Sequence, residues 1–365
     1  MKIPSPMKIT WAAALCGALV LAAGCSDGGK PAARSSAAGG QAAAAVPVPA
    51  PDAEAEPAPA PEPRKPAFPL TGMPSETETN ERPIMVMVEN SPQARPQSGL
   101  DEADIVYEIL AEGDITRFAA VYQSKSPKTI GPVRSIRPYY VELGDGLDAY
   151  IVHAGWSQDA MDLIAERKLA HFDQVYGDDE YYWRDPKRKM PHNLYTSIEL
   201  IRRGVKDKRF RTAWNGPHPS FAKAGEREVA AVSAQAGSAV PEKRAVIPYM
   251  RGYTVSYDYD ESTGTYLRSM NGERHVDAVS GRTLSAVNVI ISFAEHRVLD
   301  KEGRREVALS GPGRGVLLQQ GTKRDVTWER KDGLIRVFAD GRELGWLPGQ
   351  TWVQVVPVGT APSFE

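Results

Sequence analysis

The sequence predicts an α+β protein, with a mixed α/β N-terminal domain over residues 69–221 and a smaller, mostly β C-terminal domain over residues 244–358. Three observations support this prediction. In the first part, short apolar runs typical of strands alternate with segments whose apolar residues recur at helical spacing. In the second part, short β-rich runs are separated by glycine-containing turns. Between them, residues 222–243 are small and charged without an apolar stripe, which predicts a linker or a surface insertion.

The N-terminal segment predicts that the protein is exported and says nothing about its fold. Lys2 and Lys8 precede the apolar run WAAALCGALVLAAG, which is too short for a comfortable transmembrane anchor, so residues 1–24 are interpreted as a lipoprotein signal peptide. The run ends in LAAGC, which resembles a bacterial lipobox with alanine in place of the usual leucine. Lipidation of Cys25 would then anchor the chain in the membrane. The alternative is ordinary secretion with a free Cys25 thiol; Cys16 would leave with the signal, so the mature chain has no disulfide.

Residues 25–68 are predicted to be a disordered tether. They alternate alanine, proline and acidic residues and contain almost no large apolar side chains, so they cannot bury enough surface to fold. Proline-rich chain extends by about 3 Å per residue, which gives a reach on the order of 100 Å. The folded part would therefore work within the cell envelope, on the extracytoplasmic face of the bacterial membrane.

The elements of the N-terminal domain follow from local patterns. RPIMVMVEN, ADIVYEILAE and DITRFAAVYQS are predicted strands, and the short turn at Gly113-Asp114 makes the last two a hairpin. DAYIVHAG is a predicted buried strand. SQDAMDLIAERKL is a predicted helix with Ser157 as N-cap, and TSIELIRRGVKDK is another, opened by Thr196 or Ser197.

The C-terminal domain shows the period of strands throughout. YTVSYDYDESTGTYLRSMNG predicts a hairpin, because alternating aromatic and polar residues flank a Ser-Thr-Gly turn. AVNVIISFAEHRVL, GRGVLLQQG, RDVTWERKDGLIRVF and TWVQVVP continue the pattern. The tryptophans Trp328, Trp346 and Trp352 are either core residues or a surface that docks a protein partner.

Charge excludes one class of function. The formal net charge is −2, and loss of the signal peptide makes it more negative. A general nucleic-acid binder needs an excess of lysine and arginine to neutralise phosphates. We therefore expect no nucleic-acid partner.

The stretch GPVRSIRPYY predicts a helix start bordered by cations. Ser135 is a favourable N-cap and Pro138 suits the first helical turn. Arg134 and Arg137 would then border the positive end of the helix dipole, a position that favours an anion. That anion is either a ligand or an internal carboxylate, Glu112 or Asp114, from the neighbouring hairpin.

Other polar residues extend this candidate site. Arg117 falls on an apolar strand face, where a guanidinium needs a partner or a ligand. His192 and Asn193 lie in an aromatic, proline-punctuated loop that could line a cleft. His153 ends an apolar strand just before a helix, where open sheets place ligand-binding groups, although a lone histidine there is more often structural.

No known catalytic motif is complete. The sequence lacks a G-x-S-x-G elbow, an H-E-x-x-H motif and a P-loop, so no cofactor is expected. Glu112 and His153 are the candidate general bases. A metal held by both His153 and His192 with Glu112 or Asp148 is an alternative without support from ligand spacing, so no metal is predicted.

The sequence resembles the YerB-like family, bacterial envelope proteins classed as lipoproteins that contain a domain of unknown function. The resemblance runs through ARPQSGLDEADIVYEILAEGDITRF, GPVRSIRPYY, VHAGWS, PHNLYTS and GQTWVQVVP. It implies an N-terminal and a C-terminal part but no reaction. The positions matching the family's polar motif letters are Arg95, Glu108, Glu112, Thr116, Arg117, Arg134, Ser135, Arg137, His153, Ser157, His192 and Asn193. Where the family usually has EGGITRF, this chain has EGDITRF, which adds a negative charge beside Arg117.

The leading functional hypothesis is a lipoprotein that binds an anionic cell-envelope component, such as a phosphate-bearing polymer or a peptidoglycan carboxylate. Its predicted ligand-binding residues are Arg117, Arg134, Ser135, Arg137, His192 and Asn193. The alternative is a hydrolase or transferase that acts on such a polymer, with Glu112 or His153 as base. A third hypothesis is a protein partner at the C-terminal domain.

Overall fold

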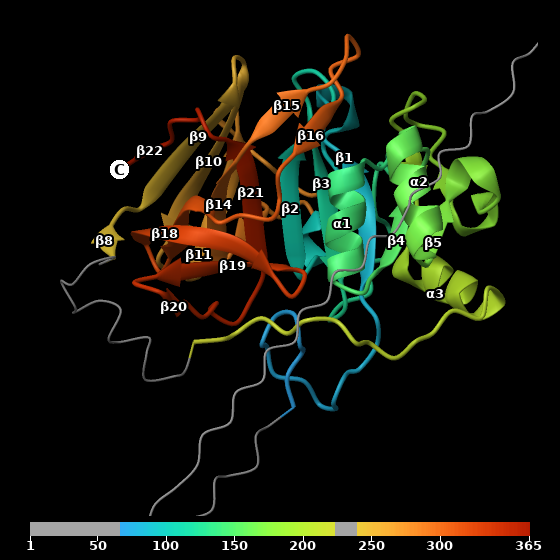
Figure 1. Cartoon of the computed structure of the whole chain (residues 1–365), viewed down its shortest axis with the longest axis horizontal. Helices are drawn as coiled ribbons and strands as arrows, with labels where there is room; N and C mark the ends of the chain where they lie inside the picture. Colours follow the sequence, from blue (N-terminus) through green and yellow to red (C-terminus); the bar gives the residue numbers. More distant parts are fainter. Residues whose placement is uncertain (1–65, 223–238) are drawn as a thin grey trace, which may run out of the picture. The chain divides into compact units, whose positions relative to one another are not determined.

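The structure is a computed structural model that describes residues 66–222 and 239–365. Its main feature is a twelve-stranded sheet in the order β20-β19-β18-β17-β14-β21-β2-β3-β1-β4-β5, with β8 added beside β18 (Figure 1). Its strands are β1 (Ile84–Glu89), β2 (Ile105–Leu110), β3 (Thr116–Tyr122), β4 (Tyr150–His153), β5 (His171–Asp173), β8 (Val240–Pro241), β14 (Asn288–Ala294), β17 (Gly313–Gln319), β18 (Thr322–Lys331), β19 (Leu334–Ala339), β20 (Arg342–Glu343) and β21 (Thr351–Pro357).

The sheet is continuous across the N-terminal and C-terminal parts of the chain. β21 lies between β14 and β2 and is parallel to both. The first six residues of β21, TWVQVV, are buried, as expected for a central strand with parallel neighbours. The last strand of the large sheet therefore joins the two parts through backbone hydrogen bonds.

The second sheet has six strands in the order β12-β11-β10-β9-β22, with β13 beside β11. Its strands are β9 (Arg244–Met250), β10 (Tyr253–Asp260), β11 (Thr265–Met270), β12 (Glu273–Arg274), β13 (Ser285–Ala286) and β22 (Ser363–Phe364). Two short pairs complete the strands: β6 (Trp183–Arg184) with β7 (Leu194–Tyr195), and β15 (His296–Val298) with β16 (Arg305–Val307).

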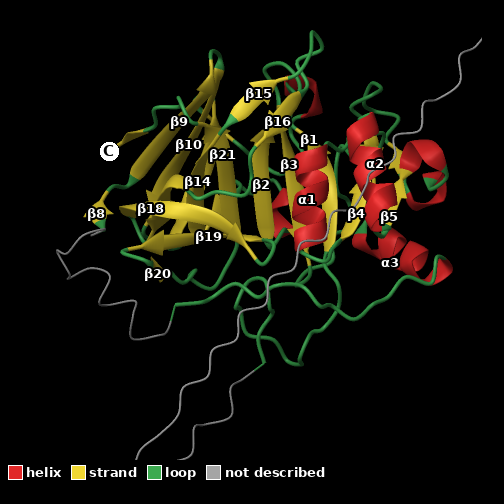
Figure 2. Cartoon of the chain, in the orientation of Figure 1, coloured by secondary structure: helices red, strands yellow, loops and turns green. Residues whose placement is uncertain are grey.

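Two apolar layers cover the large sheet. The helices α1 (Pro138–Gly146) and α2 (Gln158–Arg167) pack with one face of the sheet through residues such as Tyr140 and Ile164. The opposite face packs against α3 (Ile198–Asp207) and the second sheet, for example through Ile201 and Tyr257. Figure 2 shows the helices gathered at the end of the sheet that carries β1, β4 and β5.

Most local predictions are confirmed. β2 and β3 form the predicted hairpin, as do β10 and β11. Ser157 and Ser197 are the N-caps of α2 and α3, and the Ser197 hydroxyl accepts the predicted kind of bond, from Leu200 N at 3.1 Å. Among the described residues all three α-helices precede residue 208, so the C-terminal part is mostly β as predicted.

The α/β character of the N-terminal part is only partly supported. β1 and β2 both pair with β3 in antiparallel fashion, and only β4 and β5 continue from β1 in parallel. The short turn between β2 and β3 favours antiparallel pairing of these two strands.

The three tryptophans for which the sequence left two interpretations, core or docking surface, are core residues. Trp328, Trp346 and Trp352 are at most 3% exposed, so their indoles offer no surface to a partner. Cys25, the predicted lipidation site, lies outside the described residues, as do most of the predicted tether and most of the predicted linker. Within the described ranges, no helix is long and apolar enough to cross a membrane.

Candidate functional site

The segment carrying Arg134 to Arg137 is held between β1 and the loop after β4. Arg134 N donates to Met87 O at 2.9 Å, and Ile136 N donates to Gly155 O at 3.1 Å. These contacts lie at the carboxyl ends of two parallel strands, β1 and β4. Open sheets commonly place ligand-binding groups at such an edge.

The helix after this segment begins later than predicted. Pro138 is its first residue, which confirms the prediction for proline, but the N-cap is Arg137 rather than Ser135. Ile136 forms an extended bridge with Trp156, and this tertiary pairing keeps the backbone of the segment out of the helix. Ser135 therefore cannot act as the cap.

Glu112 is the centre of the first ion-pair cluster. Its Oε2 lies 2.5 Å from Arg117 Nη2, and its Oε1 pairs with Arg137 Nη2. Arg117 also donates to Ser135 O at 3.1 Å. The internal carboxylate that the sequence offered as an alternative to a ligand is thus present, and it is Glu112.

Burial explains why Arg117 needs this partner. Its side chain is only 7% exposed and lies on the same strand face as the buried Ala119 and Val121. A guanidinium there is stable only when paired. The expectation that Arg117 requires a partner on its apolar face is confirmed.

The Glu112 cluster changes the titration of its members. Burial opposes ionisation of Glu112, but the attraction of Arg117 and Arg137 outweighs it, so the pKa of the carboxyl lies below its usual value. Burial, together with repulsion from Arg117, lowers the pKa of Arg137 against the attraction of Glu112. A carboxylate held in this way is a weak base near neutral pH.

Glu89 is the centre of a second, adjacent cluster. His192 Nδ1 lies 2.9 Å from Glu89 Oε2, and Arg134 Nε lies 3.6 Å from Glu89 Oε1. Glu89 is the register partner of Arg117 across β1 and β3, which puts the two clusters side by side. The side chain of Arg134 is 32% exposed, and its Nε has no hydrogen-bond partner among the described residues.

The structure therefore brings together five of the six predicted ligand-binding residues. The chain of contacts runs through Arg117, Arg134, Ser135, Arg137 and His192. The side-chain oxygen of Asn193 instead accepts a bond from Arg184 at 3.0 Å. Three guanidiniums and two carboxylates leave the combined cluster with one excess positive charge when His192 is neutral.

His153 is a fully buried residue with internal partners. Its Nδ1 lies 3.1 Å from Gly155 O, and its Nε2 lies 3.2 Å from Nδ1 of His171. Burial lowers the pKa of His153 to about 4, so the ring is neutral at pH 7. Its environment matches the structural interpretation of this histidine rather than a contact with substrate. Among the residues that the structure describes, no group of three or more His, Cys, Asp or Glu side chains is placed to hold a metal ion.

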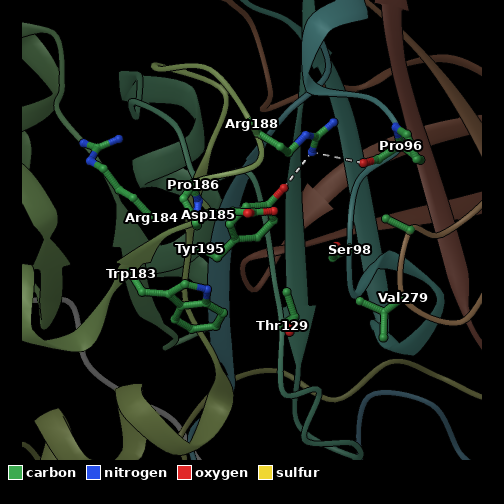
Figure 3. Close-up of a pocket in the computed structure, with 11 residues that line it drawn as sticks. Pro96, Ser98, Thr129, Trp183, Arg184, Asp185, Pro186, Arg188, Tyr195 and Val279 are labelled. Carbon is green, nitrogen blue, oxygen red and sulfur yellow. Dashed lines mark hydrogen bonds between the residues drawn. The ribbon is translucent and has the colours of Figure 1, made fainter.

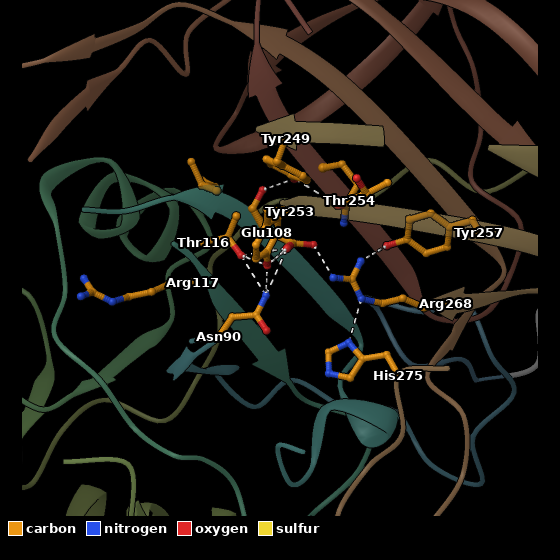
Figure 4. Close-up of polar contacts among 12 residues, drawn as sticks. Asn90, Glu108, Thr116, Arg117, Tyr249, Tyr253, Thr254, Tyr257, Arg268 and His275 are labelled. Carbon is orange, nitrogen blue, oxygen red and sulfur yellow. Dashed lines mark hydrogen bonds and ion pairs between the residues drawn. The ribbon is translucent and has the colours of Figure 1, made fainter. Parts of the chain in front are cut away.

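A larger polar network was not predicted from the sequence. Glu108 on β2 and Arg268 on β11 form an ion pair of 2.9 Å in which both side chains are 0% exposed (Figure 4). Glu108 Oε1 also accepts from Thr116 Oγ1 at 2.8 Å and Tyr253 Oη at 2.9 Å. The network joins the N-terminal and C-terminal parts inside the protein.

Neutral histidine completes this network. Arg268 Nε donates to His275 Nδ1 at 3.1 Å, and burial together with the charge of Arg268 keeps the pKa of His275 well below its usual value. The available signal in the sequence was the alternation Tyr266, Arg268, Met270, which places a cation on an apolar strand face. Arg268 and Arg117 thus follow the same rule, because a guanidinium on an apolar strand face needs a partner.

These features define a class: a strand-rich α+β protein of two domains that share one sheet, with charged clusters at the carboxyl ends of β1 and β4. The chain belongs to the DUF3048 family. The model of the family's N-terminal domain, described as a protein of unknown function, matches residues 70–211, and the model of its C-terminal domain matches residues 245–353. The resemblance inferred from the sequence motifs is thus confirmed.

A curated relative and a solved structure agree with this membership. The chain is 36% identical over 304 residues to the Bacillus subtilis (strain 168) protein named "Putative lipoprotein YerB", covering 81% of this chain and 88% of the relative. The crystal structure of YerB protein from Bacillus subtilis superposes with a TM-score of 0.73 and 36% sequence identity, covering 82% of this chain and all of that chain.

Proposed function

We propose that this protein is a lipid-anchored, extracytoplasmic protein that binds an anionic component of the cell envelope through Arg134 and the arginines beside it. The main support is the charge of the two adjacent clusters, in which three guanidiniums face two carboxylates. An added phosphate or carboxylate would restore the balance.

The proposed location rests on the N-terminus and on the relative. LAAGC resembles a lipobox ending at Cys25, and a relative that covers most of the chain is named as a lipoprotein. Two acyl chains on one cysteine would give a durable anchor without a membrane-spanning helix. The long proline-rich segment that follows would let the folded part reach envelope polymers.

Arg134 is the residue that supports ligand binding most directly. Arg117 and Arg137 share Glu112, whereas Arg134 has only a carboxylate oxygen at 3.6 Å and no side-chain hydrogen bond among the described residues. Arginine can bind phosphate or carboxylate bidentately when its fork is accessible. In the part of the chain that the structure describes, no side chain caps the neighbouring N-termini of α1 and α2, and the dipole of each helix favours an anion there.

Binding to isolated cell-wall material tests the proposal. The complete chain in detergent would be compared with Arg134→Gln, on native wall and on wall stripped of phosphate. We expect Arg134→Gln to lower the affinity by about tenfold, because it removes a charge-assisted contact. Arg167→Gln is the matched control, since Arg167 is an exposed helix residue that pairs with Asp145.

Two outcomes would contradict the proposal. One is equal binding by wild type and Arg134→Gln, and the other is an equal loss in Arg134→Gln and Arg167→Gln. If the wild type binds native wall but not phosphate-stripped wall, the recognised group is phosphate. If the wild type binds both, the recognised group is a carboxylate.

The alternative of a hydrolase or transferase has less support. Glu112 is held by two guanidiniums, and His153 is fully buried. A general base must reach the proton that it removes. Turnover of wall polymer by the wild type that Glu112→Gln abolishes, with binding retained, would revive this alternative.

A further inference from the structure

A groove of about 490 Å³ lies beside the β6–β7 pair (Figure 3). None of the six predicted ligand-binding residues lines it. Its lining consists of Pro96, Ser98, Thr129, Trp183, Arg184, Asp185, Pro186, Arg188, Tyr195, Ala278 and Val279. The volume lies within the range of small-molecule sites.

The segments that line the groove come from different parts of the chain, and hydrogen bonds join them to one another. Ala278 N donates to Gln97 O at 2.7 Å, and Gly99 N donates to Asp277 Oδ2 at 2.6 Å. Val279 is nevertheless 69% exposed on its wall. The groove is therefore formed in advance rather than assembled by a ligand, which reduces the entropic cost of binding.

An aromatic pair forms one wall. Trp183 and Tyr195 are cross-strand partners whose ring centroids are 6.1 Å apart with planes at 26°. Figure 3 shows both rings beside Asp185, with Thr129 and Ser98 across from them. An apolar ring surface next to hydroxyl and carboxylate groups suits a ligand with one apolar face and polar edges.

The cations of the groove are held by neutral groups. Arg188 donates to Tyr195 Oη at 2.6 Å, to Pro96 O at 3.3 Å and to Arg95 O at 2.9 Å. Arg184 donates to Asn193 Oδ1 and Gln174 Oε1. Within the two described ranges, neither arginine makes an ion pair with a carboxylate.

Further charge surrounds these arginines. The loop RDPKRK, residues 184–189, holds four cations and one carboxylate, and Lys187 and Lys189 are exposed. Asp185 Oδ1 accepts a bond from the backbone N–H of Lys187 at 2.8 Å. The loop thus presents net positive charge together with one carboxylate acceptor.

We propose that this groove binds a sugar unit that carries an acidic group. The apolar face of the sugar ring packs on Trp183, its hydroxyls bond to Asp185 and Arg188, and the acid faces the cations of the 184–189 loop. A bare phosphate would leave Trp183 unused, and a neutral sugar would leave the positive charge uncompensated.

Titration calorimetry with the complete chain tests this site. The ligand is a tetramer of galacturonate, which has one carboxylate per sugar, and its neutral match is the same tetramer with the carboxylates reduced to alcohols. We expect wild type to prefer the acidic form by about tenfold, and Trp183→Ala to weaken its binding by about tenfold or more. Lys187→Gln combined with Lys189→Gln should reduce the preference for the acid.

The controls separate this site from the rest of the surface. Tyr176→Ala removes an aromatic ring that is 67% exposed, and Lys301→Gln removes an exposed cation outside the groove; neither should change the binding. Arg134→Gln should also leave tetramer binding intact, so failure of this site and failure of the proposed function are distinguishable.

Three results would overturn the inference. These are no binding of the acidic tetramer by wild type at millimolar concentration, equal binding of the two tetramers, and unchanged binding by Trp183→Ala. If Trp183→Ala lowers the thermal unfolding midpoint, Trp183→Phe replaces it in the comparison. Phenylalanine keeps a ring surface and should retain part of the affinity, whereas a complete loss in a folded Trp183→Phe would contradict stacking.

Discussion

The Glu112 cluster and the groove beside the β6–β7 pair use arginine in opposite ways. In the cluster, Arg117 and Arg137 share a carboxylate. In the groove, the partners of Arg184 and Arg188 among the described residues are neutral side-chain and backbone oxygens. In the first arrangement the positive charge is balanced by a carboxylate of the protein itself, and in the second it is available to a ligand.

The difference follows burial. Arg117 is 7% exposed and would be costly without Glu112, whereas Arg184 is exposed and water can solvate it. Arg268, at 0% exposure with Glu108, is the extreme of the first kind. The cost of removing an arginine should therefore fall in the order Arg268, Arg117, Arg184.

The largest effect is expected for Arg268→Met. It leaves the carboxylate of Glu108 buried without its cation, which should lower the free energy of unfolding by about 3–5 kcal/mol. Urea denaturation measures this change. The double variant Glu108→Leu with Arg268→Met removes both charges and should recover part of the loss, because the buried hydroxyls of Thr116 and Tyr253 still lose their acceptor. A single variant as stable as wild type would contradict the structural role.

Arg117→Met should cost less. Glu112 keeps Arg137 as a partner, so we expect a loss of about 1–3 kcal/mol, mainly from the unmade hydrogen bonds. The same denaturation experiment on Arg297→Met, whose side chain is 73% exposed, is the control and should show a change near zero. An equal change in the free energy of unfolding in the two variants would contradict the distinction between buried, paired arginines and exposed ones.

Acid should weaken the Glu112 cluster selectively. Because the pKa of Glu112 is lower in the folded protein than in the unfolded chain, its stabilising contribution is complete above the unfolded pKa, about 4.3, and is lost as the pH falls through the folded pKa. The difference in unfolding free energy between wild type and Glu112→Gln should therefore shrink below about pH 5. A difference that stays constant from pH 7 to pH 2 would show that the ion pairs contribute nothing.

The smallest effect on stability is expected in the groove. Arg184→Gln should change the free energy of unfolding by less than about 0.5 kcal/mol, because an exposed side chain with neutral partners contributes little. Its affinity for the acidic tetramer should nevertheless fall. A destabilisation comparable to that of Arg117→Met would show that Arg184 belongs with the structural arginines.

Local physics explains what the sequence predicted well. The β2–β3 hairpin is encoded by adjacent strands and a short turn, and the starts of α2 and α3 by Ser157 and Ser197. The ion pair of Arg117 with Glu112 was also within reach, because the two residues flank that turn. Ser135 was misassigned as a cap because its segment pairs with a loop that local patterns do not identify.

By itself, then, the sequence determined the order of the elements, the family and a cationic segment next to a helix start. Only the tertiary structure decided that β21 enters the sheet between β2 and β14, that Arg268 meets Glu108, and that Trp183 shares a groove with Val279. The reason is that strand partners and buried charge partners are chosen by the packing of whole faces across long sequence separations. Composition, spacing and turns constrain each strand but do not say which distant strand lies beside it.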